Sequence, residues 1–282
     1  MRLASLVGGG VAVVRDSAVL PLGEALAELS TMREIAAGGD EAVARVDAWA
    51  AAQPAPAWVP LERVSLAAAV PDPGAIYTVG LNYGARADGP DRPLIYGKAA
   101  SSVAGDGATL AWDRSLTANV DAECELGIVI GRLASNVTPE EAMGHVFGWT
   151  IIDDVSSRDE WLDGDQWLIG KSMPGFCPVG PWVVTADELA PDDLRLGCTI
   201  NGEAIQADRT SAMRFGVAHI VSYLSRHLVL RPGDLIASGT PARLTTPPGP
   251  GRRLEPGDEV RCWIEGIGEL TTRIGAHEEQ TR

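Results

Sequence analysis

Short apolar runs, separated by glycine and proline, dominate the chain from about residue 75 onward. Runs of this length, closed by turn residues, are typical of strands rather than helices. The expected strands are residues 76–81, 94–98, 148–152, 182–185, 198–200, 204–206, 235–238 and 259–264. Asn201-Gly202 lies between two of these runs and is the sequence type that favours a two-residue hairpin turn. The pattern therefore predicts a sheet-rich body.

Helical patterns are fewer. Residues 212–228 carry apolar side chains close to helical spacing, which predicts an amphipathic helix. Thr138-Pro-Glu-Glu141 is a capping box with proline at the first helical position, so a short helix is expected to run to about His145. Residues 22–29 and 40–52 are rich in alanine and glutamate and also predict helices.

The pattern divides the chain into a small leading unit and a large body. Residues 1–68 combine a short strand at 11–14 with the two alanine-rich helices, and a proline-punctuated connector, residues 53–60, closes the unit. Residues 69–275 form the strand-rich main domain, and residues 276–282 are a polar tail. We therefore expect an α+β fold that is dominated by strands, with a small N-terminal α/β appendage.

Composition narrows the class of partner. The formal net charge of −15 argues against nucleic acid and against an anionic membrane surface. No apolar run approaches the roughly 20 residues of a spanning helix, and the first residues lack the pattern of a secretory signal. The four cysteines are far apart and form no CxxC pair, which favours buried free thiols in a reducing compartment. These features predict a cytoplasmic protein with a small-molecule substrate.

The most informative segment is Glu123-Cys-Glu125, which opens an apolar run. Alternate side chains of a strand share a face, so the two glutamates are expected to point the same way. Buried carboxylates that lie side by side repel each other unless a cation is bound between them. Asp154, in a second acidic segment, supplies a third oxygen ligand, and a hard divalent cation with water completing its coordination shell would resolve this repulsion. The segment predicts a metal site.

The two lysines of the chain form a second group of candidates. Lys98 and Lys171 are the only lysines, and every other cationic side chain except histidine is arginine. A lysine that is retained in a chain that otherwise uses arginine suggests a need for a compact ammonium whose pKa can be adjusted. Survival of two lysines by chance is the alternative.

Ordered short motifs between residues 75 and 275 resemble the fumarylacetoacetate hydrolase (FAH) superfamily. They are Val79-Gly-Leu-Asn-Tyr83, Lys98, Glu123-x-Glu125-Leu, Asp153-Asp-Val-Ser-Ser-Arg158, Gly170-Lys-Ser172, Pro178-x-Gly-Pro181, Asn201-Gly-Glu203, Pro232-Gly-Asp234, Gly239-Thr-Pro241 and Gly257-Asp258. The resemblance implies a β-roll core, a homodimer, and Mg²⁺, Mn²⁺ or Ca²⁺ at Glu123, Glu125 and Asp154. It also implies a 2-oxo acid or 1,3-dicarbonyl substrate and a metal-stabilised enolate.

The resemblance also implies roles for individual side chains. Lys171 would stabilise the developing enolate oxygen, or would only pair with a metal carboxylate. Arg158 would hold a substrate carboxylate, or would brace Asp159. Thr240 would donate to a substrate oxygen, or serve only as a turn residue. Tyr83 is expected in the substrate pocket, and Lys98 at its rim or in the layer behind it, with simple surface exposure as the alternative.

The chain departs from the family pattern in the segment that follows Asn82-Tyr83. The histidine and glutamate that form a dyad on the family's lid are replaced by Arg86 and Gly89. Arginine cannot act as a base at ordinary pH, so Arg86 would clamp a carboxylate or an oxyanion. Asp88 and Glu160 are the candidate substitute bases. The four histidines are interpreted as structural.

A second departure lies after Arg158. Trp161 stands where the family commonly has a glutamine, which predicts a larger or more apolar substrate. Because the dyad is absent, hydrolysis is less expected than decarboxylation, tautomerisation or isomerisation. Two other hypotheses stay open: a cyclase or other biosynthetic enzyme on the same scaffold, and a non-catalytic relative that binds a metal and a ligand.

Overall fold

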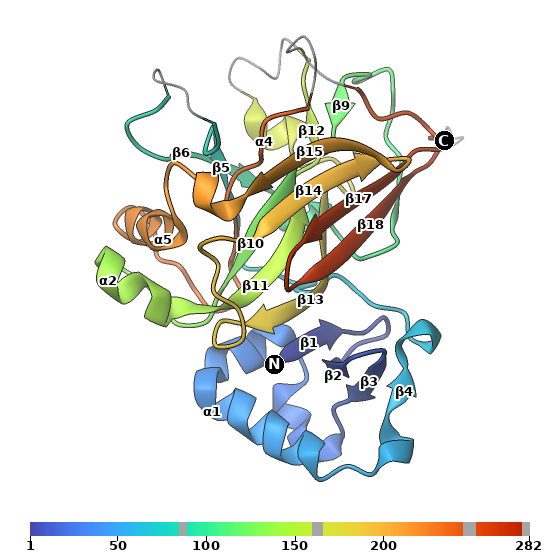
Figure 1. Cartoon of the computed structure of the whole chain (residues 1–282), viewed down its shortest axis with the longest axis vertical. Coiled ribbons are helices and arrows are strands. Elements are labelled where there is room, and N and C mark those ends of the chain that lie inside the picture. Colours follow the sequence, from blue (N-terminus) through green and yellow to red (C-terminus); the bar gives the residue numbers. More distant parts are fainter. Residues whose placement is uncertain (85–88, 160–165, 245–251, 278–282) are drawn as a thin grey trace.

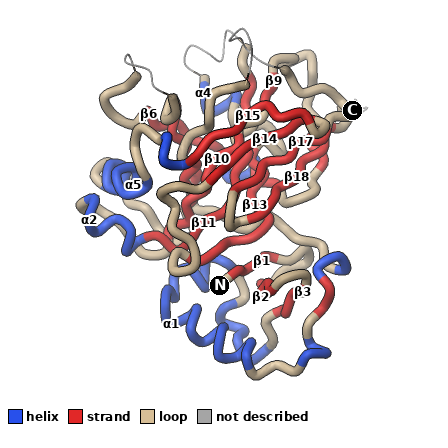
Figure 2. Tube along the Cα trace, viewed as in Figure 1, coloured by secondary structure: helices blue, strands red, loops and turns tan. Residues whose placement is uncertain are grey.

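The computed structural model describes residues 1–84, 89–159, 166–244 and 252–277 (Figure 1). Strands predominate over helices, as the colouring in Figure 2 makes plain. The expected strand-dominated α+β class is therefore confirmed. The two lysines, the acidic segments and the Gly-Thr-Pro turn all lie in the body of the molecule, which is built from two large sheets and a short two-stranded ladder.

The larger sheet runs in the order β4-β3-β2-β1-β13-β11-β10-β16-β5-β6, and β7 pairs with β13. These strands are β1 (Arg2–Ser5), β2 (Val11–Arg15), β3 (Ala18–Pro21), β4 (Val59–Pro60), β5 (Ile76–Gly80), β6 (Leu94–Lys98), β7 (Val103–Ala104), β10 (Cys124–Ile130), β11 (Val146–Asp153), β13 (Cys177–Thr185) and β16 (Leu235–Ala237). The central strands β10 and β11 are buried along their whole length, which explains their continuous apolar runs.

The smaller sheet runs in the order β15-β14-β17-β18-β8, and β9 pairs with β12 in a short separate ladder. These strands are β8 (Thr109–Leu110), β9 (Val120–Asp121), β12 (Ser156–Ser157), β14 (Arg195–Ile200), β15 (Glu203–Arg209), β17 (Glu259–Ile264) and β18 (Gly268–Ile274). Asn201 and Gly202 both have positive φ, 52° and 82°, so the predicted hairpin between β14 and β15 is confirmed.

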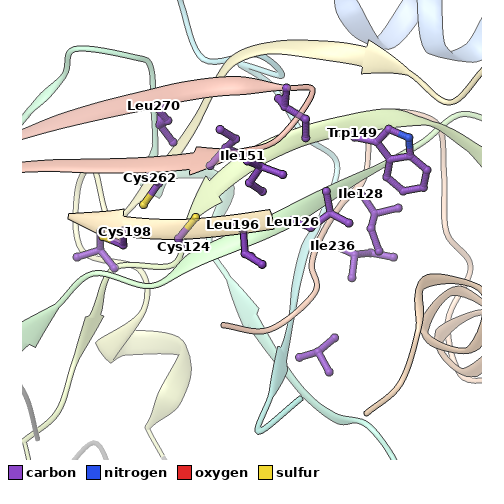
Figure 3. Close-up of a cluster of buried hydrophobic side chains, with 14 of the residues drawn as sticks. Cys124, Leu126, Ile128, Trp149, Ile151, Leu196, Cys198, Ile236, Cys262 and Leu270 are labelled. Carbon is purple, nitrogen blue, oxygen red and sulfur yellow. The ribbon is translucent and has the colours of Figure 1, made fainter. Parts of the chain in front are cut away.

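The main core fills the space between the two sheets. Leu126, Ile128 and Ile151 of the larger sheet pack with Leu196 and Leu270 of the smaller one (Figure 3). The same cluster contains three of the cysteine side chains. They are Cys124, Cys198 and Cys262, and with Cys177 all four cysteines are free and buried, as the sequence predicted. The core fixes β10 from one side, so the residues at the start of β10 have a rigid support.

The helices among the described residues are α1 (Met32–Ala51), α2 (Pro139–Ala142), α4 (Trp167–Gly170) and α5 (Val217–Ser225), with short 3₁₀ turns η1 (Glu24–Leu29), η2 (Ala55–Ala57), η3 (Leu61–Arg63), η4 (Ala100–Ser102), η5 (Met143–His145) and η6 (Thr210–Ala212). The capping box predicted at Thr138 is present at the start of α2. Among the described helices, none combines the length and apolar character that crossing a membrane requires.

The prediction of one helix over residues 212–228 is wrong at both ends. Helix α5 begins at Val217 and ends at Ser225. The backbone N–H of Arg214 donates to the carbonyl of Asn82 at 2.7 Å, and that of Phe215 donates to the Asn82 side chain at 2.9 Å. These long-range hydrogen bonds hold residues 214 and 215 outside the helix, so tertiary contacts override the local pattern.

The N-terminal unit continues the larger sheet. Strand β1 pairs antiparallel with β13, with Leu3 opposite Val183, and α1 lies beside the strands of this unit (Figure 1). Helix α1 begins at Met32, well before the predicted residue 40, because Thr31 caps it and Gly39 only kinks it. The boundary at residue 68 between two domains stays a prediction.

Candidate metal centre

The three predicted metal ligands converge at one end of the β10–β11 pair. Cys124 is paired with Asp153, so Glu123 immediately before β10 faces Asp154 immediately after β11. Glu123 lies outside the strand in which the sequence analysis placed it, yet one oxygen from each of Glu123, Glu125 and Asp154 lies within 4.8 Å of the others. The pairing of β10 and β11 therefore creates the cluster.

The backbone around Glu123 is held on both sides. The N–H of Glu123 donates to the Asp153 carboxyl at 2.8 Å, and the N–H of Asp154 donates to the carbonyl of Glu123 at 2.9 Å. Burial raises the pKa of Asp153 to about 7. Its second oxygen has no partner within the described part of the chain. Asp153 thus positions Glu123 rather than joining the cluster.

Glu125 is the most constrained of the three carboxyls. It is buried, and the backbone N–H of Gly239 donates to its Oε2 at 2.7 Å. Burial first, and then the charges of Asp154 and Glu123, raise the pKa of Glu125 well above its usual range. The ionised form of this carboxyl is therefore disfavoured as long as no cation compensates for its charge.

Asp154 shows the opposite behaviour. Burial alone would raise its pKa, but the ammonium groups of Lys171 and Lys98 lower it to about 2. Lys171 Nζ lies 2.5 Å from Oδ2, and Lys98 Nζ lies 2.7 Å from Oδ1. Both lysines are buried, so the surface-exposed alternative for Lys98 is wrong. Lys98 also donates to the Val155 carbonyl at 3.0 Å, behind the cluster.

Lys171 lies at the C-terminal end of α4, where it faces the cavity. Its ammonium donates to Ser156 Oγ at 2.8 Å and lies 3.4 Å from Glu123. Burial alone would lower the pKa of Lys171, but the three carboxylates of the cluster raise it. This side chain therefore stays charged at neutral pH. Lys171 therefore forms salt bridges to two carboxylates of the cluster and also lines the cavity.

A cavity of about 760 Å³ opens over the cluster. Tyr96 and Trp167 form an aromatic wall, with ring centroids 4.9 Å apart. Thr78 and Tyr83 also line the cavity, and their buried hydroxyls have no hydrogen-bond partner in the described part of the chain. Burial, followed by the charge of Glu125, raises the pKa of Tyr83, so its hydroxyl is a donor at neutral pH.

Arg158 and Thr240 line the same cavity. Arg158 donates to Asp121 at 3.0 Å and to Glu123, whereas Asp159 accepts from Asn119 at 3.1 Å. No bond from Arg158 to Asp159 is found among the described residues. The Thr240 hydroxyl accepts from the Gln206 amide at 2.7 Å and donates to the Cys124 carbonyl at 3.0 Å. Substrate contacts of both residues stay predictions.

The sequence analysis missed part of the cavity wall. Asp121, Gln206, Arg243 and Arg253 line the cavity. Asp121 could have been found, because it precedes Glu123 by two residues, as Glu123 precedes Glu125. Arg243 follows the Gly-Thr-Pro turn by two residues, but no local pattern distinguishes it or Arg253 from surface arginines.

Several predicted residues lie outside the described part of the chain. They are Arg86, Asp88, Glu160 and Trp161, and their assignments stay predictions. Gly89, at the position of the second dyad member, is described, and its carbonyl accepts from Arg214 at 3.3 Å. Glycine has no side chain that could serve as a base there.

The donor set fits a hard divalent cation. Three carboxylates suit Mg²⁺, Mn²⁺ or Ca²⁺ and do not suit a soft metal. All three line the cavity, so a cation bound to them would keep coordination positions open to water or to a ligand. A divalent cation would also offset the effects that raise the pKa of Glu125, which are burial first and then repulsion by Asp154 and Glu123.

Comparison with known proteins gives a consistent result. A family model described as fumarylacetoacetate (FAA) hydrolase, C-terminal, matches residues 75–275. An uncharacterized protein of Staphylococcus aureus (strain USA300) is 37% identical over 210 residues, which cover 73% of this chain and 70% of the relative. Two solved structures are also similar over nearly the whole chain.

The first is a putative HpcE protein from Mycobacterium smegmatis, 36% identical with a TM-score of 0.83, and the alignment covers 98% of this chain and 100% of that one. The second is the fumarylacetoacetate hydrolase of the psychrophile Exiguobacterium antarcticum, 31% identical with a TM-score of 0.86 and the same coverage. The similarity therefore includes the N-terminal unit as well as the region matched by the family model.

Proposed function

The chain belongs to the fumarylacetoacetate hydrolase family, and we propose that it is a divalent-metal-dependent enzyme acting on a 2-oxo acid or a 1,3-dicarbonyl compound. The observation that carries the proposal is the cluster of Glu123, Glu125 and Asp154 on the wall of a cavity, beside the buried ammonium of Lys171. Mg²⁺ is the first candidate metal, with Mn²⁺ and Ca²⁺ as alternatives.

A cation bound at these carboxylates would act as a Lewis acid on the two adjacent oxygens of such a substrate and favour its enolate. Lys171 places a permanent positive charge next to the cluster, where negative charge develops on the substrate oxygen. Lys98 holds Asp154 from behind, and Asp153 holds the backbone of Glu123. Tyr83 lines the cavity and its hydroxyl has no hydrogen-bond partner among the described residues, which supports a role as a donor to the substrate.

Decarboxylation, tautomerisation and isomerisation fit this set of groups better than hydrolysis does. All three need a stabilised enolate, whereas hydrolysis also needs a base that activates water. The described residues at the position of the family's dyad include Gly89, which offers no base. Asp88 is the proposed proton acceptor, Arg86 the proposed clamp, and Trp161 the proposed apolar contact. A cyclase on this scaffold would use the same groups.

We also propose a cytoplasmic homodimer. Leu81, which lines the cavity, and Leu168 and Ile169 of α4 are each more than half exposed. Burial of these side chains against a second copy would remove apolar surface from water. A single monomeric species in sedimentation-velocity experiments at micromolar concentration would exclude this dimer.

The test uses oxaloacetate and acylpyruvates with Mg²⁺ or Mn²⁺. We expect a metal-dependent change in enol absorbance with the native protein and none with Glu123→Ala. If neither protein gives a change, the catalytic proposal is wrong. Thermal stabilisation by metal and oxalate together would then identify a non-catalytic binding protein.

A further inference from the structure

Three arginines converge on one buried carboxylate at the side of the cavity. Arg158 Nε lies 3.0 Å from Asp121 Oδ1, while Arg243 Nη2 and Arg253 Nη1 lie 2.8 Å and 2.9 Å from Asp121 Oδ2. The ladder between β9 and β12 places Asp121 opposite Ser156, next to the metal cluster. Asp121 therefore holds the guanidinium groups of three separate segments against the cavity.

Arg243 is the best placed of the three to receive a ligand. Its Nη2 also donates to the Ala122 carbonyl at 2.6 Å, which fixes the plane of the guanidinium. Its Nη1 is buried and has no hydrogen-bond partner within the described residues. A buried cationic N–H without an acceptor is costly, and an anionic group in the cavity would supply that acceptor.

The charges in the cavity wall leave room for an anionic ligand. Among the described residues of the wall, four carboxylates and four cations are equal in number: Asp121, Glu123, Glu125 and Asp154 against Arg158, Lys171, Arg243 and Arg253. Metal binding requires ionised ligands and adds two positive charges. With a divalent metal bound, and with Lys98 paired to Asp154 from behind, the site has an excess of positive charge that is complementary to a ligand with two or more negative charges.

On the basis of the proposed function, we propose that Arg243 and Arg253 bind a second anionic group of the substrate, at the end remote from its 2-oxo acid. The substrate is then a dianion: one end faces the metal cluster, and the other takes charge-assisted hydrogen bonds from the two guanidinium groups. Asp121 positions these arginines and limits the excess of positive charge. The aromatic pair Tyr96 and Trp167 packs against the part of the substrate between its two ends.

The structural alternative is that the three arginines only attach their segments to Asp121. That reading predicts no preference between ligands that differ in a terminal carboxylate. The two readings are separated by the pair 2-oxoadipate and 2-oxohexanoate, which have the same chain length and differ in having a carboxylate or a methyl group at the far end. Oxalate, which offers only the metal-binding end, reports on the cluster alone.

The experiment measures the dissociation constants of these three compounds by calorimetry, with Mn²⁺ bound to the native protein and to variants. We expect the native protein to bind 2-oxoadipate at least about 10-fold more tightly than 2-oxohexanoate, in line with a charge-assisted hydrogen bond. Arg243→Gln should remove most of this preference and leave oxalate affinity within about 2-fold. Arg253→Gln serves as the second variant. Arg195→Gln is the matched control, because Arg195 forms an exposed pair with Glu265. It should change neither the preference for 2-oxoadipate nor the affinity for oxalate.

The outcomes separate this proposal from the proposed function. Equal affinity of the native protein for the two long ligands, with oxalate still bound in a metal-dependent way, overturns the second anion site and leaves the metal centre intact. A preference that persists in both Arg243→Gln and Arg253→Gln also overturns it. No metal-dependent oxalate binding would contradict the proposed function itself.

Discussion

The cavity has two walls in which charge is arranged in opposite ways. At the metal cluster, Glu123, Glu125 and Asp154 come from the ends of buried strands, and lysine ammonium groups compensate for them. At the arginine wall, one carboxylate, Asp121, compensates for three guanidinium groups, two of which follow the Gly-Thr-Pro turn. We propose that one wall receives a cation and that the other receives an anion.

The two walls differ in burial, and this difference determines how each responds to the loss of a charged partner. Glu125 and Asp154 are almost completely buried, whereas the arginine side chains are between 14% and 23% exposed. Loss of a partner in the buried cluster leaves an uncompensated charge, which is strongly destabilising. Water can compensate partly for a lost partner at the arginine wall. Substitutions in the cluster should therefore affect both function and stability, and those at the arginine wall mainly selectivity.

The largest effect is expected from Glu125→Gln. Glutamine keeps the acceptor for the Gly239 N–H but cannot supply the ligand charge, so metal affinity and activity should fall by more than ~100-fold, since loss of outer partners alone costs about 10–100-fold. Because the pKa of Glu125 is raised by burial and by its neighbours, the metal-free variant should unfold at a higher temperature than the native protein. Calorimetric metal titration and thermal unfolding check the two effects.

Glu203→Gln is the matched control, because Glu203 is exposed on β15 and outside the cavity wall. It should leave metal affinity and unfolding temperature unchanged. If Glu125→Gln binds metal as tightly as the native protein, Glu125 is not a ligand and the cluster is a structural charge network.

The variants Lys171→Met and Lys98→Met compare the two lysines that form salt bridges with Asp154. Lys171 faces the cavity, so its loss should lower kcat by about 10²–10³-fold, as loss of one electrostatic stabiliser does. Lys98 lies behind Asp154, and its loss should act through metal geometry and cost about 10–100-fold in metal affinity. Steady-state kinetics at saturating metal separates the loss of kcat from the loss of metal affinity. Equal losses of kcat at saturating metal would show that Lys171 has no special role.

Gly239→Ala tests the support of Glu125. Gly239 has φ of +101°, and a Cβ there would lie 2.6 Å from Asn82 Cβ and 2.9 Å from the Val79 carbonyl. We expect a loss of about 1–3 kcal/mol in the free energy of unfolding and weaker metal binding, because the N–H that donates to Glu125 must move. Gly257→Ala is the control: φ is +94°, but the added Cβ meets no atom within 4 Å. It should strain the backbone without changing metal affinity.

The smallest effect concerns pH. Because the pKa of Glu125 is raised in the metal-free protein, metal binding should release a proton, and affinity should weaken as pH falls through that raised pKa, by at most about 10-fold per pH unit. The pKa of Asp154 is lowered to about 2, so Asp154 stays ionised over this range. Titrations in buffers of different ionisation enthalpy count the protons. Affinity that is independent of pH would contradict the raised pKa of Glu125.

The sequence predicted the grouping of the three carboxylates because they follow strand alternation and a motif order. Glu123 and Glu125 differ by two positions, and Asp154 follows a strand that must pair with theirs. The same local reasoning placed Glu123 inside a strand that begins only at Cys124, and it extended α5 over residues that Asn82 holds elsewhere. Boundaries depend on contacts between distant segments, which a local pattern does not contain.

The arginine wall could not be predicted for the same reason. Arg243 and Arg253 are held at the cavity by Asp121, which lies more than 120 residues earlier in the chain. Nothing in the neighbouring residues of either arginine indicates a buried partner. Asp121 was within reach, since it extends the alternation of Glu123 and Glu125, but its role depends on arginines that only the fold brings to it.

Proton exchange at the carbon next to the oxo group tests the central claim most directly, because it requires the enolate and no particular later step. Pyruvate and 2-oxoadipate would be incubated in D₂O with Mg²⁺ and followed by proton NMR. We predict loss of the C3 proton signal with the native protein at a rate well above that with Mg²⁺ alone, and no such excess with chelator or with Glu125→Gln. Exchange no faster than with Mg²⁺ alone, for both compounds, would contradict the assignment of this chain as a metal-dependent enolate-forming enzyme.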